Sequence, residues 1–225
     1  MADTLNAAWA EAWLRNSAAV VAEHRKELID LDRAIGDADH GENLDRGFSA
    51  VVQKLDESNP ETPGACFKLA AMTLMSKVGG AAGPLFGTAY LRAGTTVGES
   101  TELDSPLLAQ ALAAARDGIV ARGKAEVGDK TMIDAWTPAV DAATEAAEAG
   151  AGPADVLEAA AVAAQQGAES TDPLVARKGR ASYLAERSAG HRDPGAASSA
   201  LLLRAAADAA AAAGNGAGEA GASGA

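Results

Sequence analysis

The sequence predicts an all-α protein, an antiparallel up-and-down bundle of eight helices. Alanine is the most frequent residue, and it is the strongest helix former. Aromatic residues make up only 4% of the chain, and the β-branched residues that favour strands are also sparse. Apolar residues recur at helical spacing instead, as Leu5, Trp9 and Trp13 do, and no polar–apolar alternation persists beyond a few positions.

Start and stop signals place the eight helices in order. A capping side chain or a proline opens a helix, and glycine or a polar cluster closes one. The predicted helices are 3–31 with its apolar stripe, 42–55 closed by a polar turn, 63–78 stopped by two glycines, 84–98 opened by Pro84, one from Asp104-Ser105-Pro106 to Arg122, 131–149, 153–170 opened by Pro153, and 194–213 opened by Asp193-Pro194. Residues 1–213 are thus expected to form a single helical domain, and the Gly- and Ala-rich residues 214–225 a flexible tail.

Charge and composition exclude several classes of partner. The 19 basic and 31 acidic residues give a net charge of −12 without a basic cluster able to neutralise a nucleic-acid backbone or an anionic membrane. No uncharged apolar stretch approaches the ~20 residues of a membrane span, since Arg204 and Asp208 interrupt residues 196–213. The single Cys66 suits a reducing compartment, and the first residues lack the pattern of a signal peptide. The sequence predicts a cytoplasmic protein that binds neither nucleic acid nor membrane.

Loop composition differs between the two ends of the predicted bundle. Consecutive antiparallel helices place alternate loops at opposite ends. One end receives ordinary polar turns, residues 56–62, 98–104 and 150–152. The other end receives the loops with unusual chemistry, residues 32–41, 79–83, 123–130 and 171–193. The last of these is long for a connection in a compact domain, which favours a functional role at this end.

The first of these loops carries three aspartates, Asp32, Asp37 and Asp39. Carboxylates this close repel each other unless a cation or hydrogen bonds compensate, and oxygen ligands suit Mg²⁺ or Ca²⁺. An EF-hand starting at Asp37 fails, because Gly41 falls at position 5 instead of 6 and Phe48 stands where a glutamate is required. A sparse carboxylate cluster that leaves room for phosphate suits Mg²⁺. The alternative is a helix cap and turn with solvated aspartates.

Two further loops suggest anion binding. Residues 79–83 are small and precede a helix that begins at Pro84, and such a helix start presents free N–H groups to an anion. Residues 118–125 match the G-x-x-x-x-G-K pattern, but Ala125 replaces the required Ser or Thr and no strand precedes it, so a P-loop is rejected.

The last loop is basic in an otherwise acidic chain. Arg177, Lys178 and Arg180 lie within four positions. Cations on one flank and carboxylates on the other fit a polyphosphate between them, although a solvated basic turn is the alternative. The residues alone therefore indicate a site for Mg²⁺ and a phosphorylated small molecule.

Four sequence segments together resemble the nucleotide-binding L subunit of dihydroxyacetone kinase. They are IGDADHGENLDRGFSAV at 35–51, VGGAAGPLFGT at 78–88, GIVARGKAEVGDKTM at 118–132 and ARKGRASYLAERSAGHRDPGA at 176–196. The resemblance implies an antiparallel eight-helix barrel with a nucleotide and two Mg²⁺ ions at one end. That location coincides with the end that loop composition singles out.

The resemblance also implies roles for individual residues. Asp32, Asp37 and Asp39 would bind the Mg²⁺ ions that bridge the phosphates. The residues that would line the phosphates are His40, Gly41, Glu42, Asn43, Ala81 and Ala82. The residues that would hold the nucleoside part of ADP or ATP are Gly123, Met132, Arg180, Asp193, Pro194 and Gly195. The chain departs from the family at Ala82, where relatives carry serine, so a hydroxyl beside the phosphates is missing.

The family resemblance further implies partner proteins. A separate K subunit holds dihydroxyacetone covalently, and the L subunit delivers the phosphoryl group. In the branch linked to the phosphotransferase system, a phosphohistidine on an M subunit rephosphorylates bound ADP; in the other branch ATP and ADP exchange. The alternatives are a kinase subunit for another ketose, a tetrulose or a fatty acid, and a non-catalytic, nucleotide-loaded coregulator. The sequence leaves the oligomeric state open, including a homodimer.

Overall fold

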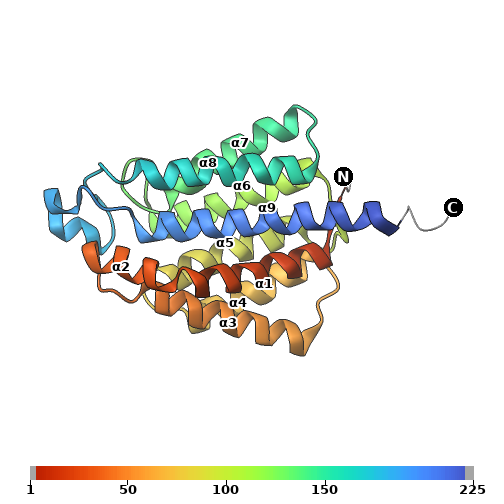
Figure 1. Ribbon diagram of the computed structural model, residues 1–225, viewed down its shortest axis with the longest axis horizontal. Coiled ribbons are helices and arrows are strands. Elements are labelled where there is room, and N and C mark those ends of the chain that lie inside the picture. Colours follow the sequence, from red (N-terminus) through yellow and green to blue (C-terminus); the bar gives the residue numbers. More distant parts are fainter. Residues whose placement is uncertain (1–3, 221–225) are drawn as a thin grey trace.

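The computed structural model describes residues 4–220 and confirms the all-α prediction (Figure 1). Its long helices are α1 Ala7–Glu23, α2 Arg25–Ile35, α3 His40–Ser58, α4 Pro63–Lys77, α5 Ala82–Val97, α6 Ser105–Gly123, α7 Ile133–Glu148, α8 Pro153–Ser170 and α9 Pro194–Ala220. A 3₁₀ segment, η1, spans Arg180–Ser188, and two short strands are β1 Leu5–Asn6 and β2 Glu102–Leu103.

The long helices other than α2 pack side by side in a closed ring. Each contacts the next in the chain, and α9 returns to contact α1. Figure 1 shows these helices running along the long axis of the molecule, with α2 and the loops that follow α4, α6 and α8 at one end. The helix α2 leaves the ring order and contacts α3, α9 and η1. The ring therefore gathers at one end the four loops that the sequence singles out.

Large aromatic side chains and many alanines fill the interior of the ring. Trp9 and Trp13 on α1 are buried, and the indole N–H groups donate to the backbone carbonyls of Ala206, at 3.1 Å, and Leu202, at 2.8 Å. Both rings meet Phe67 edge-on, with centroid distances of 6.1 and 5.3 Å. These contacts satisfy the buried donors and hold α1 to α9, which closes the ring.

The final helix is longer than the sequence predicts. α9 continues to Ala220 instead of ending at 213, so Gly214, Gly216 and Gly218 are helical although glycine is a weak helix former. The part 194–214 is apolar enough by composition to cross a membrane, but 61% of the relevant window is buried inside the protein, as in a core helix. Residues 221–225 lie outside the described part of the chain, so the flexible tail remains a prediction.

Two features at the start of the chain differ from expectation. The predicted helix 3–31 is divided at His24, although hydrogen bonds of 2.9 Å from His24 N to Val20 O and from Leu28 N to His24 O bridge the division. Neither proline nor glycine marks this bend. β1 pairs with β2 in antiparallel register, Leu5 opposite Leu103, where the sequence predicts the first turn of a helix at Leu5 and a polar turn at residues 98–104.

Three element boundaries near the loop end also differ. α2 continues to Ile35 instead of ending at residue 31, so Asp32 lies on a helix and not in a loop. α3 begins at His40 instead of residue 42, and α5 begins at Ala82 instead of Pro84. Proline is tolerated in the first turn because N–H groups there have no intrahelical acceptor, so Pro84 need not be the first residue. The predicted loop 171–193 contains η1, which is interrupted at Ala185, where φ is 48°.

Candidate functional site

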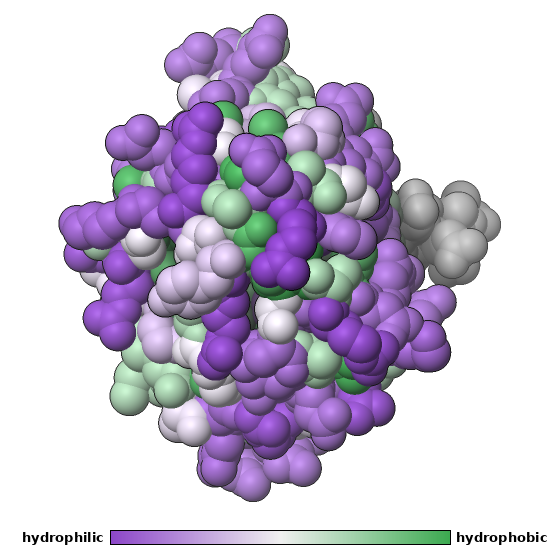
Figure 2. Space-filling view, turned by 90° about the vertical axis from the view of Figure 1, so that its left-hand side faces the viewer, coloured by the Kyte–Doolittle hydropathy of each residue, from purple (hydrophilic) through white to green (hydrophobic). Residues whose placement is uncertain are grey.

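A cavity of about 180 Å³ lies at the end of the ring where the four loops meet. It is lined by Asp32, Ile35, Gly36, Asp37, Asp39, His40, Asn43, Gly79, Gly80, Ala81, Ala82, Leu85, Lys130, Thr131, Met132, Lys178, Gly179, Arg180, Ala181, Asp193, Pro194 and Gly195. Figure 2 shows this end of the molecule, where strongly hydrophilic side chains surround a few apolar residues near the middle of the face. The convergence of the four loops confirms the argument from loop composition.

One wall of the cavity is a cluster of three carboxylates. Asp32, Asp37 and Asp39 each place an oxygen so that the three atoms lie within 4.8 Å of one another. Asp32 is buried, and its Oδ2 accepts hydrogen bonds from the backbone N–H groups of Asp39, at 2.9 Å, and His40, at 3.1 Å. These bonds fix the turn between α2 and α3. Both use Oδ2 of Asp32, and Oδ1 takes no part in them.

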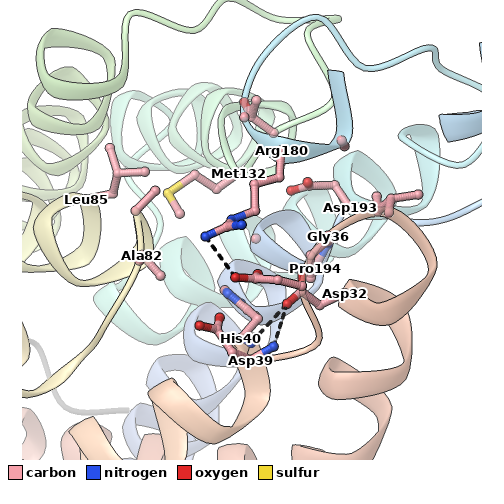
Figure 3. A pocket seen from close by; sticks show the side chains of 18 of the residues that line it. Asp32, Gly36, Asp39, His40, Ala82, Leu85, Met132, Arg180, Asp193 and Pro194 are labelled. Carbon is pink, nitrogen blue, oxygen red and sulfur yellow. Dashed lines mark hydrogen bonds and ion pairs between the residues drawn. The ribbon is translucent and has the colours of Figure 1, made fainter. Parts of the chain in front are cut away.

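The donor set of this cluster fits Mg²⁺. It consists of carboxylate oxygens, the ligands that Mg²⁺ prefers, and it is open on the cavity side, where phosphate oxygens can complete the shell. The Arg180 guanidinium lies 2.9 Å from Oδ2 of Asp37. Figure 3 shows Arg180 reaching into the pocket from the opposite side to Asp39 and His40. A cation from the last loop therefore already balances part of the negative charge of the first.

His40 anchors the start of α3 instead of presenting a charge. Its Nε2 lies 2.9 Å from Oγ of Ser198 on α9, and burial lowers the pKa of the imidazole, outweighing the nearby carboxylates of Asp32 and Asp39. A neutral ring is therefore favoured at neutral pH. His40 therefore does not present a positive charge to a ligand.

The start of α5 forms the wall opposite the carboxylates. Ala81, at its N-cap, supplies no side-chain cap, so the first N–H groups of this helix are available to an anion. Gly80 has φ of 64°, a conformation that glycine adopts without strain. A Cβ on Gly79 would lie 3.1 Å from the side-chain oxygen of Asn43. Small residues thus let the backbone approach both Asn43 and the cavity.

The remaining wall is formed by Met132 and the turn that opens α9. Oδ2 of Asp193 accepts a 2.7 Å hydrogen bond from Ala196 N, and the Asp193 N–H donates to Oγ1 of Thr171 at 3.0 Å. A Cβ on Gly195 would lie 3.0 Å from Asp193 Oδ2 and 3.6 Å from Met132. Burial raises the pKa of Asp193 from 3.8 to about 7, while the bond from Ala196 N lowers it.

We expect this carboxyl to make stability fall with pH. The folded protein binds more protons than the unfolded chain between the unfolded pKa of 3.8 and the folded pKa of about 7, so the contribution of Asp193 is largest below 3.8 and is lost as pH rises to 7. In nucleotide-free protein, wild type should therefore lose stability relative to Asp193→Asn across this window. Urea unfolding at several pH values measures the difference, and a constant difference would contradict the expectation.

Most residues that the sequence analysis selected line the cavity. They are Asp32, Asp37, Asp39, His40, Asn43, Ala81, Ala82, Met132, Arg180, Asp193, Pro194 and Gly195. Three others do not line it. A Cβ on Gly41 would lie 2.3 Å from the carbonyl of Arg25, Glu42 pairs with Arg25 at 3.0 Å, and Gly123 lies beside Leu85. Their ligand contacts, like those of the lining residues, stay predictions.

Sequence reasoning missed several lining residues, chiefly Gly36 and Lys130. A Cβ on Gly36 would lie 2.0 Å from Oδ1 of Asp32, so only glycine leaves room for this carboxylate. Lys130 is 1% exposed, and its ammonium reaches backbone carbonyls of the loop 171–193. Lysines are rarely buried, so its position in a polar loop gives no sign of this arrangement.

Comparisons with known proteins show which family the chain resembles. Residues 34–208 match the DAK2 domain. The chain is 46% identical over 192 residues to the ADP-binding subunit DhaL of the PEP-dependent dihydroxyacetone kinase of Escherichia coli, covering 85% of this chain and 91% of that protein. It is 46% identical over 197 residues to the corresponding subunit of kinase 1 of Listeria innocua, covering 88% and 93%.

A solved structure is similar as well. The dihydroxyacetone kinase from C. freundii in complex with AMP-PNP and Mg²⁺ superposes with a TM-score of 0.66 at 26% identity, over 91% of this chain. The chain spans 34% of that larger protein. The all-helical ring, the match over residues 34–208 and the near full-length similarity to two subunits together show that the chain belongs to the DAK2 domain family.

Proposed function

We propose that this chain is the Mg-ADP/ATP-binding subunit of a PEP-dependent dihydroxyacetone kinase, a phosphotransferase acting in the cytoplasm. Bound ATP would give its terminal phosphoryl group to dihydroxyacetone held on a separate K subunit. A phosphohistidine on an M subunit would then rephosphorylate the ADP in place. The observation that carries the proposal is the carboxylate cluster, whose ligand atoms lie within 4.8 Å of one another in a cavity shared by four loops.

The carboxylate wall would hold Mg²⁺, with two ions as the family resemblance implies. Mg²⁺ bound there would neutralise phosphate charge and orient the terminal phosphoryl group. The turn between α2 and α3 is fixed before any ligand arrives, because Asp32 accepts two backbone N–H groups. Asp37 pairs with Arg180, whose guanidinium is well placed to turn to phosphate oxygens when a cation takes over its partner.

The opposite wall would receive the phosphates through backbone groups. The uncapped start of α5 offers N–H groups and the positive end of the helix dipole. Ala82 supplies no hydroxyl at this place, so the N–H groups carry the contact. Met132 and Pro194 give the cavity apolar surface suited to a nucleoside.

The nucleotide that copurifies with the protein tests the proposal. Native mass spectrometry of the full chain should show bound ADP with Mg²⁺, and the same spectrum gives the oligomeric state, including a homodimer. Protein that carries no nucleotide, and that neither ADP nor ATP with Mg²⁺ stabilises against heat, would contradict the proposal.

Reconstitution tests the acceptor and the donor. Phosphoenolpyruvate, the general phosphotransferase proteins, an M subunit and a K subunit should together phosphorylate dihydroxyacetone only when this chain is present. Parallel reactions with a tetrulose or another ketose, and with ATP in place of phosphoenolpyruvate, distinguish the alternative acceptors and the branch in which nucleotides exchange. Binding of a regulator by the ADP form without any transfer would favour a coregulator instead.

A further inference from the structure

Lys130 makes an unusual set of contacts beside the site. It lies between α6 and α7 with φ of 62° and is 1% exposed. Its ammonium donates to the backbone carbonyls of Thr171, at 2.6 Å, and Asp172, at 3.4 Å, and also to that of His191. An ammonium group has three N–H donors, and here all three meet a carbonyl oxygen.

These contacts join the two ends of one segment. Thr171 and Asp172 begin the connection from α8 to α9, and His191 stands close to its end, so Lys130 ties the start of the connection to its finish. The same junction contains the bond from Gly190 N to Asp172 O, at 2.8 Å, and the bond from Asp193 N to Thr171 Oγ1. These contacts close the segment at its two ends around one buried cation, and we call this junction the base of the segment.

The middle of the segment, between the residues of the base, lies at the cavity. The lining residues Gly179 and Arg180 lie in it, and Asp193 and Gly195 follow directly after the base. Arg180 has its own support, the ion pair with Asp37. The position of the turn that opens α9 therefore depends on the base, whereas the carboxylate wall depends on α2 and α3.

We infer that Lys130 is a positioning residue for the nucleoside. Its ammonium is hydrogen-bonded to the carbonyls of the segment 171–193 and not to the carboxylates or the start of α5. Through His191 it sets the place of the turn at Asp193-Pro194-Gly195, against which Met132 packs. This inference rests on the proposed function, in which that turn holds the nucleoside. It leads to a selective expectation, because the carboxylates and the start of α5, which would hold Mg²⁺ and most of the phosphate contacts, lie outside this turn.

The test compares two ligands on the full chain. In Lys130→Met, which keeps the apolar stem and removes the donors, the affinity for Mg-ADP should fall at least tenfold, whereas the affinity for Mg-pyrophosphate should stay within twofold of wild type. Asp37→Ala should lose both ligands. Lys54→Met, the same change at an exposed lysine of α3, should alter neither. Isothermal titration calorimetry gives all the affinities.

A second variant keeps the test open if Lys130→Met does not fold. Thr171→Val removes the acceptor of the Asp193 N–H at nearly constant volume, and it should show the same selective loss of Mg-ADP. An unchanged affinity for Mg-ADP in a folded variant, or equal loss of both ligands, would overturn the positioning role. If wild type itself bound no Mg-ADP, the proposed function would fall together with this inference.

Discussion

Replacing Asp37 with alanine is expected to abolish nucleotide retention while leaving the helical content unchanged. Asp37 is exposed, it makes no contact with the core of the ring, and its oxygen belongs to the cluster whose ligand atoms lie within 4.8 Å. On the proposed function, loss of one of three carboxylates would remove a Mg²⁺ ligand and a third of the negative charge that would hold the ion. We expect the affinity for Mg-ADP to fall by about 100-fold or more, roughly 2.7 kcal/mol.

The measurement is nucleotide copurification, followed by titration of the stripped protein with Mg-ADP. Asp30→Ala is the matched control, since Asp30 is an aspartate of α2 that pairs with Lys26 and Arg33 and lies outside the cluster. It should bind Mg-ADP like wild type. Wild-type affinity in Asp37→Ala would show that the aspartates form only a helix cap and a solvated turn.

Asp37→Ala also removes the partner of Arg180, so a second variant separates the two effects. Arg180→Met keeps all three carboxylates and deletes the guanidinium that lies 2.9 Å from Asp37. If the metal ligand is what matters, Arg180→Met should weaken Mg-ADP binding less than Asp37→Ala does. The reverse order would assign the main role to the arginine.

The place of the site could be predicted from the sequence because it follows from the order of the helices. Antiparallel order sends alternate loops to opposite ends, so the polar turns separate from the loops with aspartates, glycines and arginines without knowledge of helix packing. The cavity between Asp32, Ala82, Met132 and Arg180 joins the four selected loops. The net charge of −12 gives no hint of this, since it averages over the whole surface.

Tertiary contacts determine what the sequence could not predict. The bend at His24 has no proline or glycine to mark it, and the helical hydrogen bonds continue across it. The ammonium of Lys130 finds carbonyls some forty residues further along the chain, which no local pattern encodes. The need for glycine at position 36 cannot be predicted from the sequence either. The oxygen that a Cβ would meet belongs to the buried side chain of Asp32, one helical turn earlier.

Gly36→Ala should therefore damage the proposed metal site without removing any of its three carboxylates. A Cβ at this position would lie 2.0 Å from Oδ1 and 3.0 Å from the carbonyl oxygen of Asp32. The Asp32 side chain cannot rotate away freely, because Oδ2 is held by the N–H groups of Asp39 and His40. Either those bonds break or the turn shifts, and both outcomes move the carboxylates relative to one another. Changes of this kind around metal ligands cost about 10- to 100-fold in affinity.

A matched glycine separates this effect from a general cost of adding a methyl group. Gly152 precedes α8 in one of the ordinary polar turns, has φ of −68°, and its nearest neighbour for a Cβ is Asp155 at 4.0 Å. Gly152→Ala should bind Mg-ADP like wild type, whereas Gly36→Ala should bind at least tenfold more weakly with similar helical content by circular dichroism. Equal affinities in the two variants would mean that the turn between α2 and α3 adjusts around a side chain, and that Asp32 does not need the fixed position that its two hydrogen bonds give it.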